Sequence, residues 1–349
     1  MRGHGGDWVS YHEKYGRLPL DFSTNVSPLG LPDSVREAAI QSLDSADRYP
    51  DPQCRALRRE ITAELGIPSE FCLCGNGAAD LLFRVMLAKK PRRALLPVPT
   101  FSEYEAALKA VDCVVETVPL SEKTEFRLSE EVLRFITPET DVLFLCEPNN
   151  PTGLTTPREL LLRILRRCRE TETLLVLDEC FLDFLEEPEQ HTLLSALSYH
   201  PNLLILRAFT KLYAMAGLRL GYCICSDTEL LRQMQDAGQP WAVSAVAQYA
   251  GRAALQETEY VHRVRMLLQK QRPRLLQALR ALGLRVLPGE ANYLLFQGRT
   301  GLAEALQDRG ILIRCCANYD GLDASWYRIA IRTEEENTRL LAALREVLG

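Results

Sequence analysis

The sequence predicts an α/β protein with a large lobe built on a mainly parallel β-sheet and a smaller α+β lobe. Its 349 residues exceed the length of about 250–300 at which a single hydrophobic core usually divides. Continuous apolar runs of strand length recur, and helical segments separate several of them, which is typical of strands buried on both faces. Beyond residue 240 the pattern changes to a long helical region and short strands, which indicates the second lobe.

The elements follow in chain order. GLPDSVREAAIQSL predicts an early helix, because an N-cap precedes apolar residues at helical spacing. The large lobe has strand candidates at RALLPVP, CVVETVPL, DVLFLCEP, LLVLDECF, NLLILRAF and RLGYCIC. PRELLLRILRRCRETE, with Pro157 early in the segment and leucines opposite arginines, predicts a helix that covers the sheet.

The small lobe has predicted helices within 245–282 and 334–348, and strands at LRVLP, NYLLF, ILIRCC and YRIAIRT. We therefore divide the chain into an N-terminal arm with part of the small lobe (1–45), a large lobe (46–240) and a small lobe (241–349).

Composition narrows the class of protein. The net charge of -5 comes without a basic run, which argues against nucleic acid or an anionic membrane as the partner. No apolar run reaches the roughly 18 residues of a membrane span, and the N-terminus has no leader pattern, so we expect a cytoplasmic protein. The eleven cysteines form no CxxC pair and mostly occupy apolar segments, so we expect buried free thiols and no metal site.

Three polar residues follow apolar strands at the predicted sheet edge. Lys211 comes directly after NLLILRAFT, with Arg219 eight residues later, while Asp178 and Asn150 end two other strands. In an open α/β sheet the carboxyl ends of strands face the ligand crevice. A partly desolvated lysine near a cation has a lowered amine pKa and is nucleophilic enough to form a Schiff base with a carbonyl. Taken singly, each residue could instead be a surface lysine, a capping carboxylate or a turn residue.

Together these residues suit a pyridine-ring cofactor that acts as an electron sink. Such a ring needs a carboxylate that keeps its nitrogen protonated, which Asp178 can supply, and a donor to its phenolate oxygen, which Asn150 can supply. LCGNGAADLLFRVML reads as a strand, a glycine-rich turn and a helix. The amides of Gly77, Ala78 and Ala79 could therefore face an anion at the helix N-terminus, although a single GNG turn often only joins two elements.

The order of the motifs GNGAAD, PTFSEY, EPNNPTG, DECFLDF and TKLYAMAGLRLGY resembles the fold-type I enzymes that use pyridoxal 5'-phosphate (PLP). RYPDP before these motifs and YRIAIRT after them extend the resemblance over nearly the whole chain. Within that family the sequence is most similar to histidinol-phosphate aminotransferases and threonine-phosphate decarboxylases. The resemblance implies PLP as the cofactor, a seven-stranded sheet in the large lobe, and a homodimer with shared active sites.

The resemblance also assigns roles to individual residues. Lys211 would be the catalytic residue that holds PLP, Asp178 would pair with the ring nitrogen, and Asn150 would bond the ring oxygen and lie beside the substrate. The other cofactor contacts would come from Phe101 on the ring face, from Gly77, Ala78, Thr210 and Arg219 at the phosphate, and from Tyr49 of the other subunit. Two positions depart from the family, because Ala208 offers no hydroxyl to the phosphate and Phe181 no phenol to the ring oxygen.

The substrate residues are expected in the small lobe and at the N-terminus. Arg328 resembles the family's carboxylate-binding arginine, and Arg314 is a second cation, so a substrate with a carboxylate and a phosphate would use both. Arg332 either adds its positive charge to these two arginines or lies at the surface. His4-Gly5-Gly6 resembles the decarboxylase branch, in which such an arm would close over a phosphate with His4 as a donor. The following Asp7 has no explanation from the sequence.

The implied reaction is the decarboxylation of L-threonine O-3-phosphate to (R)-1-amino-2-propanol O-2-phosphate, a step toward cobalamin. One alternative is a histidinol-phosphate aminotransferase, and a second is an O-phosphoserine decarboxylase with the same mechanism. A third alternative is a relative that only binds the cofactor, although both Lys211 and Asp178 are present.

Overall fold

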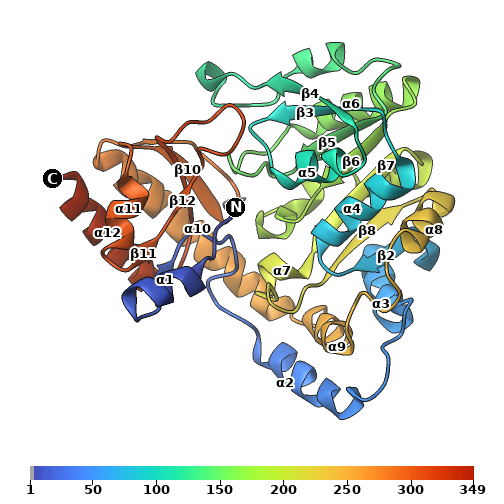
Figure 1. The fold of residues 1–349 in the computed structure, drawn as a ribbon, viewed down its shortest axis with the longest axis horizontal. Coiled ribbons are helices and arrows are strands. Elements are labelled where there is room, and N and C mark those ends of the chain that lie inside the picture. Colours follow the sequence, from blue (N-terminus) through green and yellow to red (C-terminus); the bar gives the residue numbers. More distant parts are fainter. Residues whose placement is uncertain (1–3) are drawn as a thin grey trace.

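A seven-stranded β-sheet forms the centre of the large lobe in the computed structural model, which describes residues 4–349 (Figure 1). The strand order is β2-β8-β7-β6-β5-β3-β4, and β8 is antiparallel to both of its neighbours while the other pairs are parallel. The strands are β2 (Cys72–Gly75), β3 (Arg93–Val98), β4 (Val114–Pro119), β5 (Val142–Cys146), β6 (Leu174–Asp178), β7 (Leu203–Ala208) and β8 (Gly221–Cys225). The six predicted strands and the mainly parallel sheet are confirmed.

Helices cover both faces of this sheet because its central strands are apolar on both sides. In β5, Leu143 belongs to one core cluster and its neighbours Val142 and Phe144 belong to the cluster on the opposite face. The helices of this lobe are α3 (Arg55–Leu65), α4 (Ala78–Lys89), α5 (Glu103–Lys109), α6 (Arg158–Glu170), α7 (Phe209–Leu212), α8 (Thr228–Asp236) and α9 (Ala245–Ala254). Short 3-10 helices are η1 (Ser42–Ser45), η2 (Ser69–Phe71), η3 (Glu122–Thr124), η4 (Glu130–Arg134), η5 (Leu182–Phe184), η6 (Pro188–Gln190) and η7 (Leu194–Tyr199).

The small lobe packs three helices on a four-stranded antiparallel sheet of order β12-β13-β10-β9. The strands are β9 (Arg285–Val286), β10 (Tyr293–Gln297), β12 (Arg314–Cys315) and β13 (Trp326–Ala330). The helices are α10 (Thr258–Ala281), α11 (Leu302–Gln307) and α12 (Glu334–Leu348). The predicted long helical region is therefore interrupted between α9 and α10. Three of the predicted strands are confirmed, and the fourth, ILIRCC, is divided into β12 of this sheet and a separate strand at Ile311–Leu312 that belongs to another sheet.

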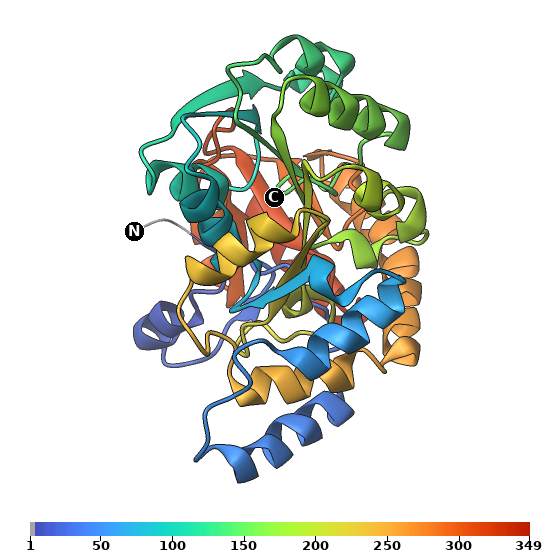
Figure 2. The same cartoon turned by 90° about the vertical axis from the view of Figure 1, so that its right-hand side faces the viewer.

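The N-terminal segment is divided between the lobes. Helix α1 (Trp8–Tyr15) and strand β1 (Leu20–Asp21) lie with the small lobe, since β1 pairs in parallel with β11 (Ile311–Leu312). Helix α2 (Asp33–Gln41) lies beside α9, as Figures 1 and 2 both show. Because α9 shares a core cluster with α3 and the large sheet, core packing favours a lobe boundary nearer α10. The boundary at residue 241 stays a prediction.

Helix α1 was not expected from the sequence, and it explains Asp7. The Asp7 carboxylate accepts a hydrogen bond from the Ser10 amide at 3.2 Å and so caps the helix N-terminus. Only Tyr11 of this helix is buried. The apolar periodicity that marks longer helices is therefore weak here.

All eleven cysteines are free thiols, and nine of them are buried. Within residues 4–349 no helix is both long enough and apolar enough to cross a membrane. The same residues contain no cluster of three or more His, Cys, Asp or Glu side chains that could hold a metal ion.

The close approach of β8 to the turn before α4 gives a first prediction. A Cβ atom at Gly221 would lie 2.5 Å from the Ala78 nitrogen and 2.8 Å from the Gly77 carbonyl carbon, both backbone atoms that cannot move independently. We expect Gly221→Ala to lower the free energy of unfolding by about 1–3 kcal/mol, as overpacking usually does. Gly217→Ala is the matched control because nothing lies within 4 Å of its added Cβ. Equal stability of the two variants in denaturant unfolding would contradict this account.

Candidate active site

A cavity of about 140 Å³ lies at the carboxyl ends of β5, β6 and β7. Parallel strands bring their last residues to one sheet edge, so residues distant in sequence meet there. The structure brings seven of the predicted site residues into its lining. The cavity is lined by Ala78, Ala79, Leu82, Phe101, Cys146, Asn150, Asp178, Cys180, Phe181, Leu206, Ala208, Thr210, Lys211 and Arg219.

Lys211 lies on α7, the single helical turn that follows β7. Its Nζ is 5.5 Å from the centroid of the Phe181 ring. Burial is the main reason that the pKa of Lys211 is lowered from 10.5; Arg328 and Arg219 lower it further, while Cys180 and Asp178 oppose the shift. The neutral amine is therefore more accessible than in an exposed lysine, as nucleophilic chemistry requires.

Asp178 is fixed by two donors at the end of β6. The buried Tyr104 hydroxyl donates to its Oδ2 at 2.6 Å, and the Cys180 amide donates to its Oδ1 at 3.0 Å. Tyr104 in turn stacks on Phe144, with ring centroids 5.0 Å apart. Sequence reasoning missed Tyr104, which lies in the first turn of α5 and meets the ring of Phe101, just before that helix, edge to face with centroids 5.5 Å apart.

The Asn150 side chain lines the same cavity, and its amide oxygen already accepts hydrogen bonds. Its Oδ1 accepts hydrogen bonds from Arg328 Nη1 and, at 3.4 Å, from the Tyr319 hydroxyl. No partner for its Nδ2 is found among residues 4–349, which leaves these two N–H bonds as donors toward the cavity. Tyr319 was also missed, because its contact with Asn150 spans 169 residues of sequence.

One end of the cavity is suited to an anion. Gly77 is the N-cap of α4 with φ of 84°, a conformation that favours glycine, and Arg219 lies so close that a Cβ on Gly77 would be 2.7 Å from Arg219 Nη2. The Gly77 amide donates to the Gly75 carbonyl at 2.8 Å rather than to the cavity. Within the described chain the amides of Ala78 and Ala79 have no partner, and they remain as donors at the helix N-terminus.

Two substrate-binding candidates lie directly opposite one another in the small-lobe sheet. Arg314 on β12 and Arg328 on β13 are register partners of an antiparallel pair, so they occupy the same face. Like charges opposite one another are unfavourable, and among residues 4–349 neither guanidinium forms an ion pair with a carboxylate. Arg314 donates instead to Asn318 at 2.5 Å. The pair is therefore suited to an anionic ligand.

Arg332 lies outside this pair. It follows the end of β13, and its Nε and Nη2 donate to Glu336 Oε1 at 2.9 and 2.8 Å. Glu336 also forms the capping box of α12 with Thr333. Arg332 therefore has neither of the two roles that the sequence left open. It does not join Arg328 as a ligand-binding cation, and it is not a free surface side chain, because it forms an ion pair with Glu336.

The N-terminal arm is seated at the small-lobe side of the site. The Gly6 amide donates to Ser23 Oγ at 2.8 Å, and the Ser23 carbonyl accepts from Arg328 Nη2 at 3.1 Å. A Cβ on Gly5 would lie 2.2 Å from the Ser23 carbonyl oxygen, so the contact requires glycine. His4 Nε2 lies 3.2 Å from Glu103 Oε1. Tyr49 is 79% exposed and stacks on Trp241, away from these residues of the arm.

The cavity fits the cofactor that the sequence implies. A guanidinium and two unpartnered amides lie at one end, a fixed carboxylate lies at the end of β6, and an amide donor and a lysine amine lie in the same lining. These are the groups that a phosphorylated pyridine aldehyde needs. Ala208 and Phe181 line the cavity without adding a hydroxyl, so both departures noted in the sequence persist.

Comparisons with known proteins agree with this geometry. The model of the family described as aminotransferase class I and II matches residues 19–344. The threonine-phosphate decarboxylase of Salmonella typhimurium is 42% identical, over 99% of this chain and 96% of that protein. The crystal structure of L-threonine-O-3-phosphate decarboxylase from Porphyromonas gingivalis has a TM-score of 0.83 at 26% identity, covering 94% of this chain and 98% of the other. That of histidinol-phosphate aminotransferase from Clostridium acetobutylicum has a TM-score of 0.88 at 28% identity with the same coverage, 94% and 98%.

The lowered pKa of Lys211 makes a prediction about the cofactor-free protein. Between its native pKa and 10.5, Lys211 binds fewer protons in the folded chain than in the unfolded chain, so this residue makes stability rise with pH across that interval. We expect Lys211→Met to lack this contribution. The gain in stability from the substitution should therefore be largest below the native pKa of Lys211 and shrink as the pH approaches 10.5.

Denaturant unfolding at a series of pH values measures this difference. Lys123→Met, at an exposed lysine on η3, is the control and should follow the wild type. If the free energies of unfolding of the wild type and Lys211→Met changed with pH in parallel, burial would not lower the pKa of Lys211.

Proposed function

This chain belongs to the class I and II aminotransferase family, and we propose on that premise that it is a PLP-dependent decarboxylase acting on L-threonine O-3-phosphate. The product would be (R)-1-amino-2-propanol O-2-phosphate, consumed in cobalamin synthesis. The 42% identity to a protein of that name over nearly the full length supports the choice of branch. The free cysteines support a reducing, cytoplasmic setting.

One observation carries the choice of substrate. Ser23 is bound on one side by the Gly6 amide and on the other by Arg328, so the arm and the small-lobe arginines form one surface. This surface holds two guanidinium groups without a neutralising carboxylate in the described chain. O-phosphothreonine carries a carboxylate and a phosphate, one anion for each arginine, whereas histidinol phosphate carries no carboxylate.

The residues of the cavity would hold PLP as follows. Lys211 would hold it covalently, Asp178 would bind its ring nitrogen, Asn150 Nδ2 would donate to its ring oxygen, and Phe101 would lie on its ring face. Its phosphate would lie at the α4 N-terminus, with contacts from Ala78, Thr210 and Arg219, while the Gly77 amide stays bonded to the Gly75 carbonyl. When bound, the cofactor accepts the electron pair released as a bond at the substrate's α-carbon breaks.

The chain's own residues would decide which bond breaks. Arg328 and Arg314, with Asn150 beside them, would grip the carboxylate and phosphate and fix the rotation about the α-carbon, which is orientation used as catalysis. His4, Gly5 and Gly6 would close over the phosphate, with His4 leaving Glu103 to donate to a phosphate oxygen. Carbon dioxide leaves, and the α-carbon must take up one proton in its place. Lys211 Nζ is the group proposed to deliver it.

A homodimer is part of the proposal. Tyr49 is exposed in the monomer and stacks on Trp241, itself exposed, so an apolar pair is presented to a second copy. In that assembly Tyr49 would reach the cofactor phosphate of the other subunit. The site would then be completed only by the dimer.

Histidinol-phosphate aminotransferase remains the competing function, favoured by the close structural match to such an enzyme. Phe181 argues against the aminotransferase, because it departs from the family's phenol at this position. It is buried against Tyr293 and has no hydroxyl, so Asn150 would be the only side-chain donor to the ring oxygen in the described cavity lining. O-phosphoserine differs from the proposed substrate by one methyl group, which typically changes binding by about 1–3 kcal/mol.

The deciding experiment supplies the PLP-loaded protein with O-phosphothreonine, O-phosphoserine and histidinol phosphate in turn. We expect carbon dioxide from O-phosphothreonine without any keto acid, a slower reaction with O-phosphoserine, and no reaction of histidinol phosphate. Lys211→Ala should show no turnover and no borohydride-reducible cofactor adduct. Reaction of histidinol phosphate alone, and only with 2-oxoglutarate present, would establish the aminotransferase instead.

The arm can be tested by a substitution that moves it without touching the cofactor residues. Gly5→Ala places a methyl group against the Ser23 carbonyl, and we expect about a tenfold rise in KM for O-phosphothreonine, the order expected when one charge-assisted hydrogen bond is lost. Cofactor absorbance should be unchanged. His12→Ala, at an exposed histidine on α1, is the matched control and should keep the wild-type KM. Removal of the first seven residues should reproduce the effect of Gly5→Ala; an unchanged KM in both would exclude the arm from the site.

A further inference from the structure

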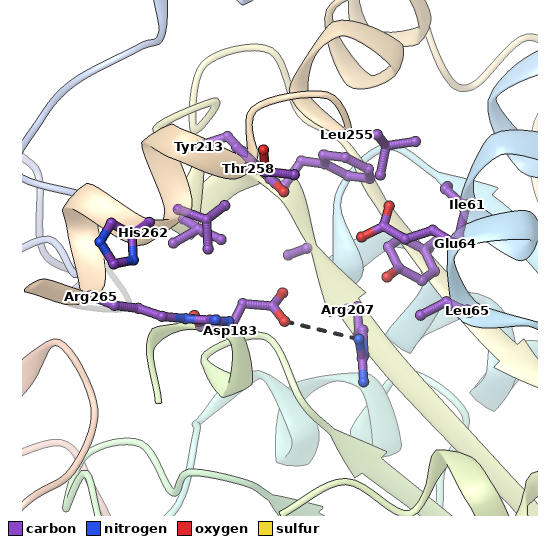
Figure 3. A pocket seen from close by; sticks show the side chains of 15 residues that line it. Ile61, Glu64, Leu65, Asp183, Arg207, Tyr213, Leu255, Thr258, His262 and Arg265 are labelled. Carbon is purple, nitrogen blue, oxygen red and sulfur yellow. Dashed lines mark hydrogen bonds and ion pairs between the residues drawn. The ribbon is translucent and has the colours of Figure 1, made fainter. Parts of the chain in front are cut away.

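A second cavity, of about 310 Å³, lies behind the candidate active site between α3, α7, β8 and α10 (Figure 3). Its volume is at the lower end of the range of small-molecule sites, about 300–1,000 Å³. None of the residues assigned to the cofactor or substrate lines it. Ala208, which was not given a role, borders both cavities.

One wall of this cavity is a cluster of three aromatic rings centred on Phe209. The centroid of Phe209 lies 5.7 Å from that of Tyr213 and 5.8 Å from that of Tyr222. Aromatic faces carry partial negative charge and attract cations, most strongly where water is excluded. Tyr222 is only 8% exposed, and its hydroxyl has no hydrogen-bond partner within residues 4–349.

Two carboxylates and two guanidinium groups lie around these rings. Glu64 and Asp183 project into the cavity from opposite sides (Figure 3). Burial is the main cause of the raised pKa of Glu64, and the charge of Asp183 raises it further while Arg207 opposes. The two carboxylates thus share the cavity, and Arg207 is the cation that acts on both of them.

The cavity's arginines are already committed elsewhere. Arg207 donates through Nε and Nη2 to Glu179 Oε2 at 3.0 and 2.8 Å, and Glu179 is fully buried. The closest approach of Arg207 Nη1 to Asp183 Oδ1 is 4.0 Å, too long for a hydrogen bond. Arg265 Nε donates to the backbone carbonyl of Asp183 at 2.9 Å. Because Arg207 is paired with Glu179, the remaining charged residues of the described lining are the carboxylates of Glu64 and Asp183 and the guanidinium of Arg265, beside the exposed His262.

We propose that this cavity binds a small organic cation, a quaternary or tertiary ammonium compound with a compact apolar body. The ammonium group would lie over the rings of Phe209, Tyr213 and Tyr222 between Glu64 and Asp183. Its apolar part would contact Ile61, Leu65, Leu212, Leu255 and Val261. The site is independent of the proposed decarboxylase activity, since it uses none of those residues.

Choline is the probe, because its trimethylammonium group matches this chemistry and it cannot condense with the cofactor aldehyde as a primary amine would. Binding is measured on the PLP-loaded protein by calorimetry and ligand-observed NMR. The comparison compound is the neutral isostere of choline, in which a tert-butyl group replaces the trimethylammonium group. We expect the isostere to bind at least about tenfold more weakly, in line with desolvated cation–aromatic contacts.

Glu64→Gln tests the location of the ligand. The Glu64 side chain lies at the cavity mouth, partly in solvent and partly covered by the cavity walls, and within residues 4–349 no hydrogen bond or ion pair holds it. It should weaken choline binding several-fold, and adding Asp183→Asn should weaken it further. Glu60→Gln, on the same helix but paired with Arg252 at 2.7 Å outside the cavity, is the matched control and should bind choline as the wild type does. Thermal unfolding and the cofactor spectrum confirm that each variant is folded.

Three results would overturn the proposal. The first is equal binding of choline and its neutral isostere, which would leave only an apolar cleft. The second is wild-type affinity in the Glu64→Gln, Asp183→Asn double variant. The third is displacement of choline by inorganic phosphate together with tighter phosphate binding in that double variant, which would make the cavity an anion site.

Discussion

The buried guanidinium of Arg328 joins the three parts of the chain that make the site. It donates to the Ser23 carbonyl 305 residues away, to Asn150 Oδ1 178 residues away, and to the Tyr319 hydroxyl at 3.2 Å. All three acceptors are neutral, so the charge is held in place without being cancelled. A buried ion that lacks a counterion is costly, and such a cost is retained where the charge is needed by a ligand. The arm, the large sheet and the small lobe are thus positioned by one side chain.

Apolar patterning accounts for most of the fold that could be predicted. Strands buried on both faces leave an unbroken apolar run, and the polar residue that ends such a run lies at the sheet edge, which is why Lys211, Asp178 and Asn150 could be placed together in advance. Helix α1 escaped prediction because it buries only Tyr11 and shows no long apolar stripe. Asp7 then looked unexplained, although its role is to cap that helix.

The missed parts of the site are contacts between distant segments. Tyr104 meets Asp178 across 74 residues, and Ser23 meets Arg328 across 305. Spacing within a motif carries no information about such pairs, because they depend on how the strands order themselves in the sheet. Arg332 shows the same limit. Side chains alternate along a strand, so Arg332 would share a face with Arg328 if the strand continued, but β13 ends at Ala330 and Arg332 turns to Glu336 instead.

The helical turn α7 has two sides, and Lys211 depends on both. Thr210 and Lys211 line the candidate active site, while Phe209 and Leu212 line the second cavity. The turn α7 therefore separates the two cavities. Burial lowers the pKa of Lys211, and the buried Phe209 ring lies between the turn and the second cavity. Replacing Phe209 by a residue with a small side chain would let water from the second cavity reach α7. The bulk of Phe209 is therefore expected to help keep water from Lys211 on the opposite side of α7.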